Sequence, residues 1–551
     1  MLRRSFVFLT CLLIGCSSEP SPNNEDPEKD AGVADAPTDA PTDPKTIEDT
    51  PITPRYQALV DSIEKERAQH GNPGVAALVL ENGKITFARG FGSRDPDKDD
   101  PVHATTLFRI GSVTKMLTTT AVLKEVAAKK IALEDKVTTL IPGFNIGGEP
   151  GEDSLTLFNL LSHSSGINDL TLLYGENGQL QDTWLAKFTT GGFKTQGYFM
   201  APPGRMYNYA NPNFALAGLV AERSSGTIYR TTMQNSVFDP LGMTRTFFLG
   251  TDVEADGDYA SANTINLETN KPEKVGPTSY DEAWSRPAGF AWSSVRDLAV
   301  FLQFLMNGNP QVLPDELRLA MQSPQMSTKL LNDHNSYGFG LTVADAELLG
   351  SPSQLYPMKV VSHAGSIPGY SANFAMRPDL GFAFITLSNT DDAYFQDSYE
   401  VALKTLTDLP ASVPIDELKP DASFYDKYAG EYDDPWNAGK MTVTHTNGKL
   451  MIDMPDLDTF GIAYEKELIA TAKHNFTIGI QGGRYGLTFM FDDKGEVDYA
   501  RVRFFVEKRT TAATSKTSKA APPNPNNLLR LLKSPVREPT RMPRGLVAAP
   551  K

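Results

Sequence analysis

The sequence predicts an α/β protein: an antiparallel sheet flanked by helices, with a mainly helical subdomain, followed by a small all-β, barrel-like domain. The first observation is that strand patterns occupy 75–90 and 371–387, whereas the chain between them is mainly helical in pattern. Remote strand pairs of this kind bury their apolar faces by completing one sheet. The second observation is that a Pro-rich stretch, 409–423, is followed over 424–508 by short strand patterns separated by turns.

The elements of the first domain, 54–408, follow from hydrophobic period and turn residues. The strands 75–80 and 84–90 flank Asn82-Gly83, a dipeptide typical of tight hairpins. A second hairpin is expected across the turn 378–381. Apolar residues at helical spacing predict the remaining elements, which are helices over 57–69, 153–161, 213–224, 297–307 and 394–406, and one that follows Ser112.

In the second domain, 424–508, two predicted hairpins support a small antiparallel barrel or sandwich. The strands 441–446 and 449–453 flank Asn447-Gly448, and another strand pair flanks the turn 492–495. The stretch 409–423 is interpreted as a linker. The last segment, 509–551, is polar, Pro-rich and basic, so we expect a disordered tail with only a short leucine-containing piece to bury.

The N-terminus has the pattern of a targeting segment. Arg3 and Arg4 precede a short apolar run that ends at Cys16, so 1–16 resembles a bacterial lipoprotein signal in which Cys16 becomes the lipidated residue. An ordinary secretory signal with a chance cysteine is the alternative. Residues 17–53 contain ten acidic and two basic residues and repeat Asp-Ala-Pro-Thr, which predicts an extended, disordered tether. We therefore expect a protein of the bacterial cell envelope, lipid-anchored at the outer membrane.

Composition excludes several functions. The chain has 551 residues and a formal net charge of −15, which argues against nucleic acid as a partner. Its two cysteines, Cys11 and Cys16, both lie in the signal segment, so catalysis by cysteine, zinc–cysteine sites and disulfides are not expected. The seven histidines lack metal-ligand spacing. We expect no metal and no cofactor.

A Ser-x-x-Lys pattern marks the candidate catalytic segment. Ser112 follows a glycine at the start of a helical pattern, and Lys115 lies about one turn further on, on the same face. A serine hydroxyl needs an adjacent proton acceptor to become a nucleophile, and a lysine serves when its pKa is lowered. The pattern alone is weak, since Ser62 and Lys65 have the same spacing in a polar helix.

Further motifs follow the Ser112 segment in a characteristic order: 160–166 (Leu-Leu-Ser-His-Ser-Ser-Gly), 207–211 (Tyr-Asn-Tyr-Ala-Asn), 287–289 (Pro-Ala-Gly), 337–340 (Tyr-Gly-Phe-Gly) and 362–365 (Ser-His-Ala-Gly). Together they resemble the serine β-lactamase-related hydrolases, which include class C β-lactamases, D-alanyl-D-alanine carboxypeptidases, D-aminopeptidases and family VIII esterases. The resemblance covers roughly 55–408 and implies a β-lactamase/transpeptidase-like fold. In some relatives a lipocalin-like domain borders the active site, and 424–508 is expected to be similar.

The residues of these motifs give a coherent acyl-transfer site. Ser112 is the expected nucleophile, while Lys115 and Tyr209 form the proton-transfer pair, with the division of roles between them left open. Asn211 lines the cleft and offers an amide to the substrate or to Lys115. By resemblance, the N–H groups of Ser112 and Ser366 form the oxyanion hole, and Gly365 lets the substrate approach the strand.

The third motif departs from the penicillin-binding pattern. His363-Ala364-Gly365 stands where lactamases carry Lys-Thr-Gly, and a histidine is a poorer cationic anchor for a substrate carboxylate. His163 is interpreted as structural, and Arg109 is given no role in chemistry. We expect an exported serine hydrolase acting on esters or small peptide and amide substrates through an acyl-enzyme. A cell-wall carboxypeptidase or β-lactamase is the second hypothesis, and a catalytically inactive envelope binding module is the third. Oligomeric state is left open.

Overall fold

A computed structural model describes residues 49–147, 151–169, 181–266, 271–330, 333–350, 353–415 and 418–510, together with Leu528, Leu529 and Leu532. The residues from Pro44 onward group into one compact unit. The expected signal segment with Cys16, and the tether as far as residue 48, lie outside the described residues.

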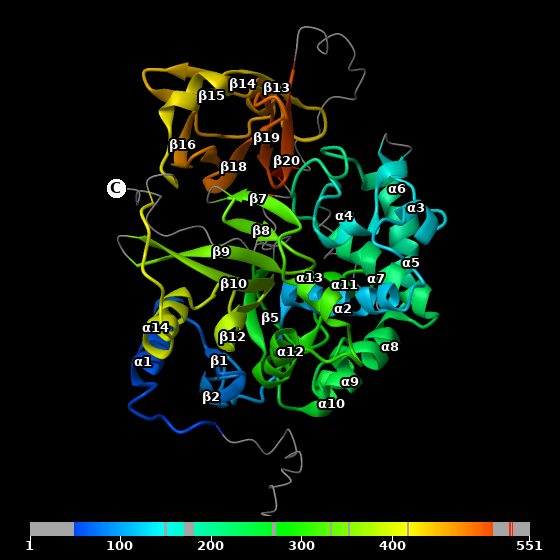
Figure 1. Cartoon of the computed structure of the whole chain (residues 1–551), viewed down its shortest axis with the longest axis vertical. Helices are drawn as coiled ribbons and strands as arrows, with labels where there is room; N and C mark the ends of the chain where they lie inside the picture. Colours follow the sequence, from blue (N-terminus) through cyan, green and yellow to red (C-terminus); the bar gives the residue numbers. More distant parts are fainter. Residues whose placement is uncertain are drawn as a thin grey trace, which may run out of the picture. The chain divides into compact units, whose positions relative to one another are not determined.

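The central feature is an eight-stranded sheet with the strand order β2-β1-β12-β11-β10-β9-β8-β7 (Figure 1). Every pairing in it is antiparallel, and β1 lies beside β12, so strands from the two ends of the domain complete one sheet as predicted. The strands are β1 Gly74–Glu81, β2 Lys84–Gly92, β7 Met326–Leu330, β8 Asn335–Tyr337, β9 Thr342–Leu349, β10 Gln354–Ile367, β11 Tyr370–Arg377 and β12 Phe382–Ser388.

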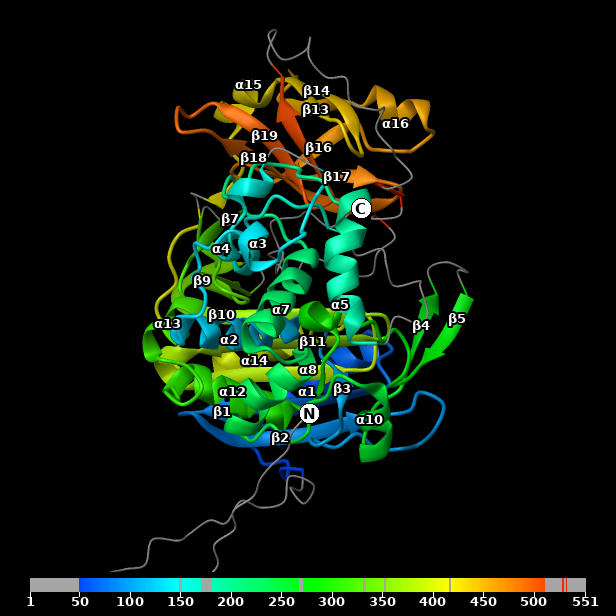
Figure 2. The same cartoon turned by 90° about the vertical axis from the view of Figure 1, so that its right-hand side faces the viewer.

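Helices cover both faces of this sheet, which explains why β1 is apolar at consecutive positions. Val75, Ala77 and Val79 face the cluster formed by α1 and α14, whereas the alternate residues of β1 face the main core. Helix α1 (Gln57–Gln69) contacts α14 (Gln396–Leu406) on that first face. The other face is covered by helices that include α2, α7 and α12, several of which are visible in Figure 2.

The helical subdomain lies between β2 and β7 in sequence. Its helices are α2 Thr114–Ala127, α3 Val137–Leu140, α4 Leu157–Leu161, α5 Thr183–Lys187, α6 Phe193–Gln196, α7 Pro212–Ser225, α8 Tyr229–Met233, α9 Asp239–Leu241, α10 Gly250–Asp256, α11 Arg286–Gly289, α12 Val295–Asn307 and α13 Asp315–Met321. Two small ribbons accompany them: β3 Phe108–Arg109 with β6 Trp292–Ser293, and β4 Ala262–Asn266 with β5 Lys271–Val275.

Two regions differ from the elements expected from sequence. The helix expected over 153–161 begins only at Leu157, because Thr156 caps it by accepting from the Asn159 N–H while the Asn159 side chain accepts from the Thr156 N–H. The strands β7 to β9 were not predicted, and of β10 only the part around His363 and Gly365 was expected as a strand, by the resemblance. β10 is long but is interrupted by Pro357 and polar residues, so it has no clear alternating pattern.

The second domain is a closed antiparallel barrel of eight strands, which confirms the barrel-like expectation. Its elements are α15 Tyr425–Tyr428, β13 Gly430–Asp434, β14 Gly439–Thr446, β15 Lys449–Asp453, α16 Pro455–Thr459, β16 Glu467–Ala472, β17 Asn475–Ile480, β18 Gly483–Phe491, β19 Val497–Val502 and β20 Phe505–Arg509. Leu528, in the segment expected to be a disordered tail, is buried in the barrel's apolar cluster, with Leu529 and Leu532 packed against it.

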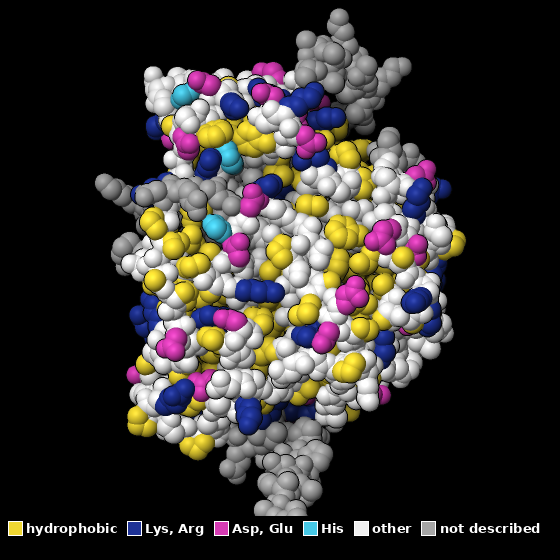
Figure 3. Space-filling model, viewed as in Figure 1, with side chains coloured by type: hydrophobic (Ala, Val, Ile, Leu, Met, Phe, Trp, Pro, Cys, Tyr) yellow, Lys and Arg dark blue, Asp and Glu magenta, His cyan; other side chains and the backbone are white. Residues whose placement is uncertain are grey.

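The barrel contacts the first domain through a shared apolar cluster. Tyr198 stacks on Trp436 with ring centroids 4.5 Å apart, and Met206 belongs to the same cluster as Tyr499 and Val506 of the barrel. Beside this cluster Arg205 Nε donates to Asp498 Oδ2 at 3.0 Å. On the face shown in Figure 3, acidic and basic side chains are interspersed.

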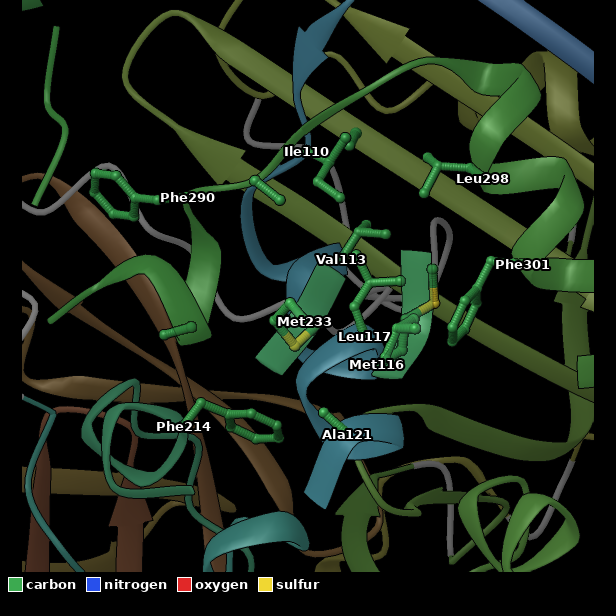
Figure 4. Packing of buried hydrophobic residues seen from close by; sticks show 14 of the residues in the cluster. Ile110, Val113, Met116, Leu117, Ala121, Phe214, Met233, Phe290, Leu298 and Phe301 are labelled. Atoms are coloured by element: carbon green, nitrogen blue, oxygen red, sulfur yellow. The ribbon is translucent and has the colours of Figure 1, made fainter. Parts of the chain in front are cut away.

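Helix α2 runs through the main core. Figure 4 shows its apolar side chains surrounded by those of other elements; the labelled residues are Ile110, Val113, Met116, Leu117, Ala121, Phe214, Met233, Phe290, Leu298 and Phe301. Its hydrophobic residues Met116, Leu117, Ala121, Val122 and Leu123 are all fully buried. The first part of α2, 114–123, is therefore enclosed by packing.

This packing predicts a large stability loss on truncation of α2. Leu117→Ala removes buried methyl groups and leaves a cavity, so the free energy of unfolding should fall by about 2–5 kcal/mol. Leu319→Ala is the matched control, since Leu319 is 50% exposed, and it should change that free energy by less than about 0.5 kcal/mol. Urea unfolding followed by circular dichroism measures both. Equal losses in the two variants would contradict the described core.

Candidate active site

Ser112 lies at the entrance to the buried helix α2. The strand β3 leads into a 3-10 turn, Gly111–Val113, and α2 begins at Thr114. Gly111 has φ +51°, a conformation that glycine adopts without a Cβ penalty. Ser112 is 5% exposed and Lys115 is fully buried. The turn therefore places the serine hydroxyl one helical turn before the lysine, on the same side of α2.

The Lys115 amine contacts three oxygen atoms. Its Nζ lies 3.0 Å from Ser112 Oγ, 2.8 Å from Asn211 Oδ1 and 2.6 Å from the Ala288 carbonyl oxygen. The amide and carbonyl oxygens can only accept hydrogen bonds, whereas a serine hydroxyl can also donate. A neutral amine has two N–H donors and one lone pair. The two donors match the carbonyl oxygens, and the lone pair then faces the Ser112 hydroxyl.

The surroundings of Lys115 favour the neutral amine. Burial, assisted by the positive charge of Arg503, holds the pKa of Lys115 well below its usual value, while the carboxylate of Asp169 opposes this shift. Desolvation is the largest of these effects because the side chain is wholly enclosed. A lowered pKa is the direction of shift that a lysine base requires.

Asn211 is oriented by Asp169. The Asn211 backbone N–H donates to Asp169 Oδ1 at 3.1 Å, and Asn211 Nδ2 lies 3.4 Å from the same oxygen. Because a carboxylate only accepts hydrogen bonds, the Asn211 amide must turn its NH₂ group toward Asp169 and its oxygen toward Lys115. Asn211 immediately precedes α7, which begins with Pro212.

Tyr209 is fully buried beside the same amine. Its ring centroid lies 4.8 Å from Lys115 Nζ, and its ring is 4.2 Å from that of His163. His163 Nδ1 accepts from the Ala210 N–H at 3.2 Å and lies 3.0 Å from Asn213 Nδ2, so this histidine fixes the segment that carries Tyr209. Burial holds the pKa of His163 well below its usual value, which fits a structural residue.

His363 lies on β10, next to the rings of Tyr209 and Tyr337. Its Nδ1 is 2.6 Å from the Ala364 carbonyl oxygen, which requires a proton on Nδ1, so Nε2 accepts from the Tyr337 hydroxyl at 3.0 Å. Burial is the main cause that lowers the pKa of His363 to about 3. The imidazole is therefore neutral at physiological pH and provides no positive charge.

Glycines allow the backbones around Ser112 to approach one another. A Cβ on Gly365 would lie 2.0 Å from the Ile110 carbonyl oxygen and 3.1 Å from the Ser112 nitrogen. A Cβ on Gly111 would lie 2.6 Å from the Ser366 nitrogen. The backbone nitrogens of Ser112 and Ser366 are thus brought to the same small region by two residues that have no side chain, as an oxyanion-binding arrangement requires.

The competing Ser-x-x-Lys pattern lies elsewhere. Ser62 is on the outer helix α1 and its hydroxyl accepts from Ser398 Oγ at 3.2 Å, while Lys65 is exposed. Its lysine is not desolvated, so the spacing alone does not create a base. Arg109, which was given no role in chemistry, is buried and donates to the carbonyl oxygen of Pro277 at 3.0 Å.

The structure adds residues that the sequence did not single out. Asp169 and Arg503 form a buried ion pair beside Tyr209, with 2.6 Å between Arg503 NH2 and Asp169 Oδ2. Tyr337 lay in a recognised motif but was assigned no contact, and the Ala288 carbonyl oxygen is a backbone group that motif reading does not reveal. No pattern in the sequence indicates that Arg503 pairs with Asp169, because this contact depends on how the barrel packs against the first domain.

Within the described residues no helix is both long enough and apolar enough to span a bilayer. Nor do histidine, cysteine, aspartate and glutamate side chains of the described part converge in groups of three or more able to hold a metal ion.

A sheet flanked by helices, with a helix-terminal serine touching a buried lysine, defines the class of hydrolases built on the β-lactamase fold. The profile of the family described as Beta-lactamase matches residues 59–407. The chain belongs to this family of serine β-lactamase-related hydrolases.

Individual relatives are distant. Protein flp of Staphylococcus aureus (strain COL) is 26% identical over 351 residues, which cover 62% of this chain and 65% of the relative, just under two thirds of its length. The solved structure of SurE with D-Leu has a TM-score of 0.58 at 20% identity and covers 83% of this chain and 99% of its own. A D-stereospecific amidohydrolase from Streptomyces sp. has a TM-score of 0.52 at 23% identity and covers 63% of this chain and 98% of its own. These structures share the fold.

The buried state of His363 predicts a pH dependence of stability. The folded-state pKa is about 3, whereas a histidine in the unfolded chain has a pKa near 6.5. Between these values the unfolded state binds more protons, so His363 stabilises the fold above about pH 6.5 and this contribution declines as the pH falls, by about 2 kcal/mol between pH 7 and pH 5.

Urea unfolding of the wild type and of His363→Gln at pH 7 and pH 5 measures this effect. The wild type should lose about 2 kcal/mol more than the variant over this interval. Equal losses would contradict a neutral, buried His363.

Proposed function

We propose that this protein is a serine hydrolase that forms an acyl-enzyme on Ser112 and acts on esters or small peptide and amide substrates. The observation that carries this proposal is the contact of 3.0 Å between Lys115 Nζ and Ser112 Oγ, made by a fully buried amine. Membership of the family supports the hydrolase class. The solved amidohydrolase with this fold indicates that the fold accommodates amide hydrolysis.

The acylation step follows from the contacts of Lys115. As Ser112 Oγ attacks the substrate carbonyl carbon, its proton passes to the Lys115 lone pair, and the carbonyl π electrons move to the oxygen. The N–H groups of Ser112 and Ser366 stabilise that oxyanion. When the tetrahedral intermediate collapses, the bond to the leaving group breaks and the leaving group takes a proton from Lys115 or Tyr209. Water then attacks the acyl group, and the carboxylic acid leaves with Ser112 restored.

The charges of the site favour a neutral substrate. His363 is held neutral by burial, so the position where relatives carry a lysine offers no cation to a substrate carboxylate. The guanidinium of Arg503 is engaged by the Asp169 carboxylate. Tyr209, Tyr337 and His363 are buried against one another as a cluster of uncharged rings beside the site. These features support ester and neutral amide substrates over penicillins and the carboxylate-bearing cell-wall peptides.

The proposal includes a place in the cell. The pattern of 1–16 supports export and lipid attachment at Cys16, and the acidic segment 17–53 supports a tether between the lipid and the enzyme. An envelope location would give the enzyme access to acyl substrates outside the cytoplasm.

Active-site labelling tests the proposed chemistry. We expect a fluorophosphonate to label the wild type on Ser112 and expect Ser112→Ala to abolish labelling. Ser62→Ala, which changes the serine of the competing pattern, should label at the wild-type rate. A fluorescent penicillin should label poorly, because His363 supplies no cation for its carboxylate. Gel fluorescence and mass spectrometry of the modified peptide measure these results.

Each other outcome supports a different function. Labelling by both probes on Ser112 would support a cell-wall carboxypeptidase or β-lactamase. Absence of labelling, with no turnover of short acyl esters, would contradict the enzyme and leave an envelope binding module. Labelling that persists in Ser112→Ala would contradict the assignment of the nucleophile.

Gly365→Ala tests the oxyanion site separately. The added Cβ would meet the Ile110 carbonyl oxygen and push β10 away from Ser112, so phosphonylation should slow by about 10²–10³-fold, as when an oxyanion donor is lost. Gly191→Ala is the control, because nothing lies within 4 Å of its Cβ. Stopped-flow or gel-based labelling rates decide between them. Similar rates in both variants would contradict the assigned oxyanion site.

A further inference from the structure

One charged residue reaches the catalytic segment from the C-terminal barrel. Arg503 lies in the turn between β19 and β20 and is 5% exposed. Its guanidinium carbon lies 4.9 Å from the centre of the Tyr209 ring, and its NH2 group is 2.6 Å from Asp169 Oδ2. Its backbone carbonyl oxygen accepts from Asn208 Nδ2 at 3.1 Å. Both the main chain and the side chain of Arg503 are therefore fixed by the hydrolase domain.

A continuous line of contacts connects Arg503 to Lys115. Arg503 binds one oxygen of the Asp169 carboxylate, and the other oxygen accepts from the backbone and side-chain nitrogens of Asn211. The amide oxygen of Asn211 accepts from Lys115 Nζ at 2.8 Å. Each hydrogen bond in this line fixes the orientation of the next group. The Asn211 amide can offer its oxygen to Lys115 only while Asp169 holds its NH₂ group.

The ion pair is needed because the Asp169 carboxylate is wholly buried. A buried carboxylate without a cation is costly and either takes up a proton or attracts another positive charge. Without Arg503, the negative charge of Asp169 would favour protonated Lys115, which lies one hydrogen bond beyond Asn211. By pairing with Asp169, Arg503 therefore prevents this carboxylate from stabilising the protonated form of Lys115, which is needed as a neutral base.

We propose that Arg503, which reaches the site from the barrel, is a positioning residue for acylation. By holding Asp169, Arg503 orients Asn211 and keeps the Lys115 amine directed at Ser112. This inference rests on the proposed function of the Ser112 site and deepens it. It also gives the C-terminal domain a specific task in the reaction, since the first domain alone would leave Asp169 without its cation.

The electrostatic effect on Lys115 has a defined sign. The groups that face its amine from the surrounding elements are Asp169, Arg503, Tyr209, His163 and His363. The positive charge of Arg503 lowers the pKa of Lys115, whereas the negative charge of Asp169 raises it. The rate of acylation should fall at acidic pH, where Lys115 becomes protonated, and we call this fall the acidic limb of the pH–rate profile. Removal of the Arg503 charge should move the acidic limb to higher pH, and removal of the Asp169 charge should move it to lower pH.

The experiment measures the rate of Ser112 phosphonylation from pH 4 to pH 10 in the full-length protein. The variants are Arg503→Met, Arg503→Lys and Asp169→Asn. Arg205→Met is the matched control, since Arg205 also joins the hydrolase domain to the barrel by an ion pair, with Asp498, but has no described contact leading to Lys115. Circular dichroism confirms that each variant is folded.

The expected results differ in sign. In Arg503→Met the acidic limb should move up by about one pH unit, which slows labelling about tenfold below the limb, because a positive charge across the Tyr209 ring is lost. In Asp169→Asn the limb should move down. Arg503→Lys restores the charge and should recover most of the shift, and Arg205→Met should keep the wild-type profile.

Two outcomes would overturn the inference. The first is that the pH–rate profiles of Arg503→Met and Asp169→Asn both coincide with that of the wild type, or both shift in the same direction. The other is an Arg205→Met shift equal to that of Arg503→Met, which would indicate a general effect of loosening the barrel. If Arg503→Met does not fold, the downward shift in Asp169→Asn and a profile of Arg503→Lys close to the wild type decide the matter.

Failure of the proposed function is distinguishable from failure of this inference. A wild type that is not labelled contradicts the function, whereas a labelled wild type with unshifted variants contradicts the role of Arg503. A crystal structure of Arg503→Met gives a readout independent of activity. The Asn211 oxygen should move away from Lys115 Nζ, and an unchanged separation of 2.8 Å would overturn the inference.

Discussion

The structure of the site depends on one constraint, the burial of the Lys115 amine. An amine in the protein interior must be hydrogen-bonded and is more stable without its charge. Asn211 and the Ala288 carbonyl oxygen supply two acceptors, which leaves the lone pair for Ser112. The burial that lowers the pKa of Lys115 thus goes together with an arrangement in which its lone pair faces Ser112.

This constraint explains why distant segments converge. Helix α2 presents Ser112 and Lys115, the start of α7 supplies Asn211, and β10 brings Gly365 against the turn before α2. These contacts persist only if the sheet and helices hold their spacing, which the fully buried residues of α2 and β1 ensure through packing. The barrel belongs to the same arrangement, because its residue Arg503 balances the buried carboxylate of Asp169.

Much of this fold could be predicted from sequence, because its signals are local. The turns Asn82-Gly83 and Asn447-Gly448 have positive φ at both residues, as tight hairpins require, and α1 spans the predicted range. The pairing of β1 with β12 followed from strand patterns at both ends of the domain. The strands β7 to β9 and the first part of β10 could not be predicted, since their residues are stabilised by neighbouring strands rather than by an apolar period of their own.

The residues of the candidate site also fall into two groups, those that the sequence indicates and those that only the structure reveals. The motif residues Ser112, Lys115, Tyr209 and Asn211 could be chosen from the sequence, and the structure brings them together around one amine. Asp169 and Arg503 could not be chosen, because an ion pair between residues 334 positions apart depends on the docking of the barrel. The neutrality of His363 also needed the structure, since its pKa reflects enclosure and the Tyr337 contact.

The most direct test is the pKa of Lys115 itself. Nuclear magnetic resonance of protein labelled with ¹³C at the lysine ε-carbons, with Lys115→Met used for assignment, follows the protonation of this amine. The account predicts a pKa well below the usual value, so that the amine is neutral near pH 7. A Lys115 signal that titrates near 10.4, as lysines in water do, would contradict it.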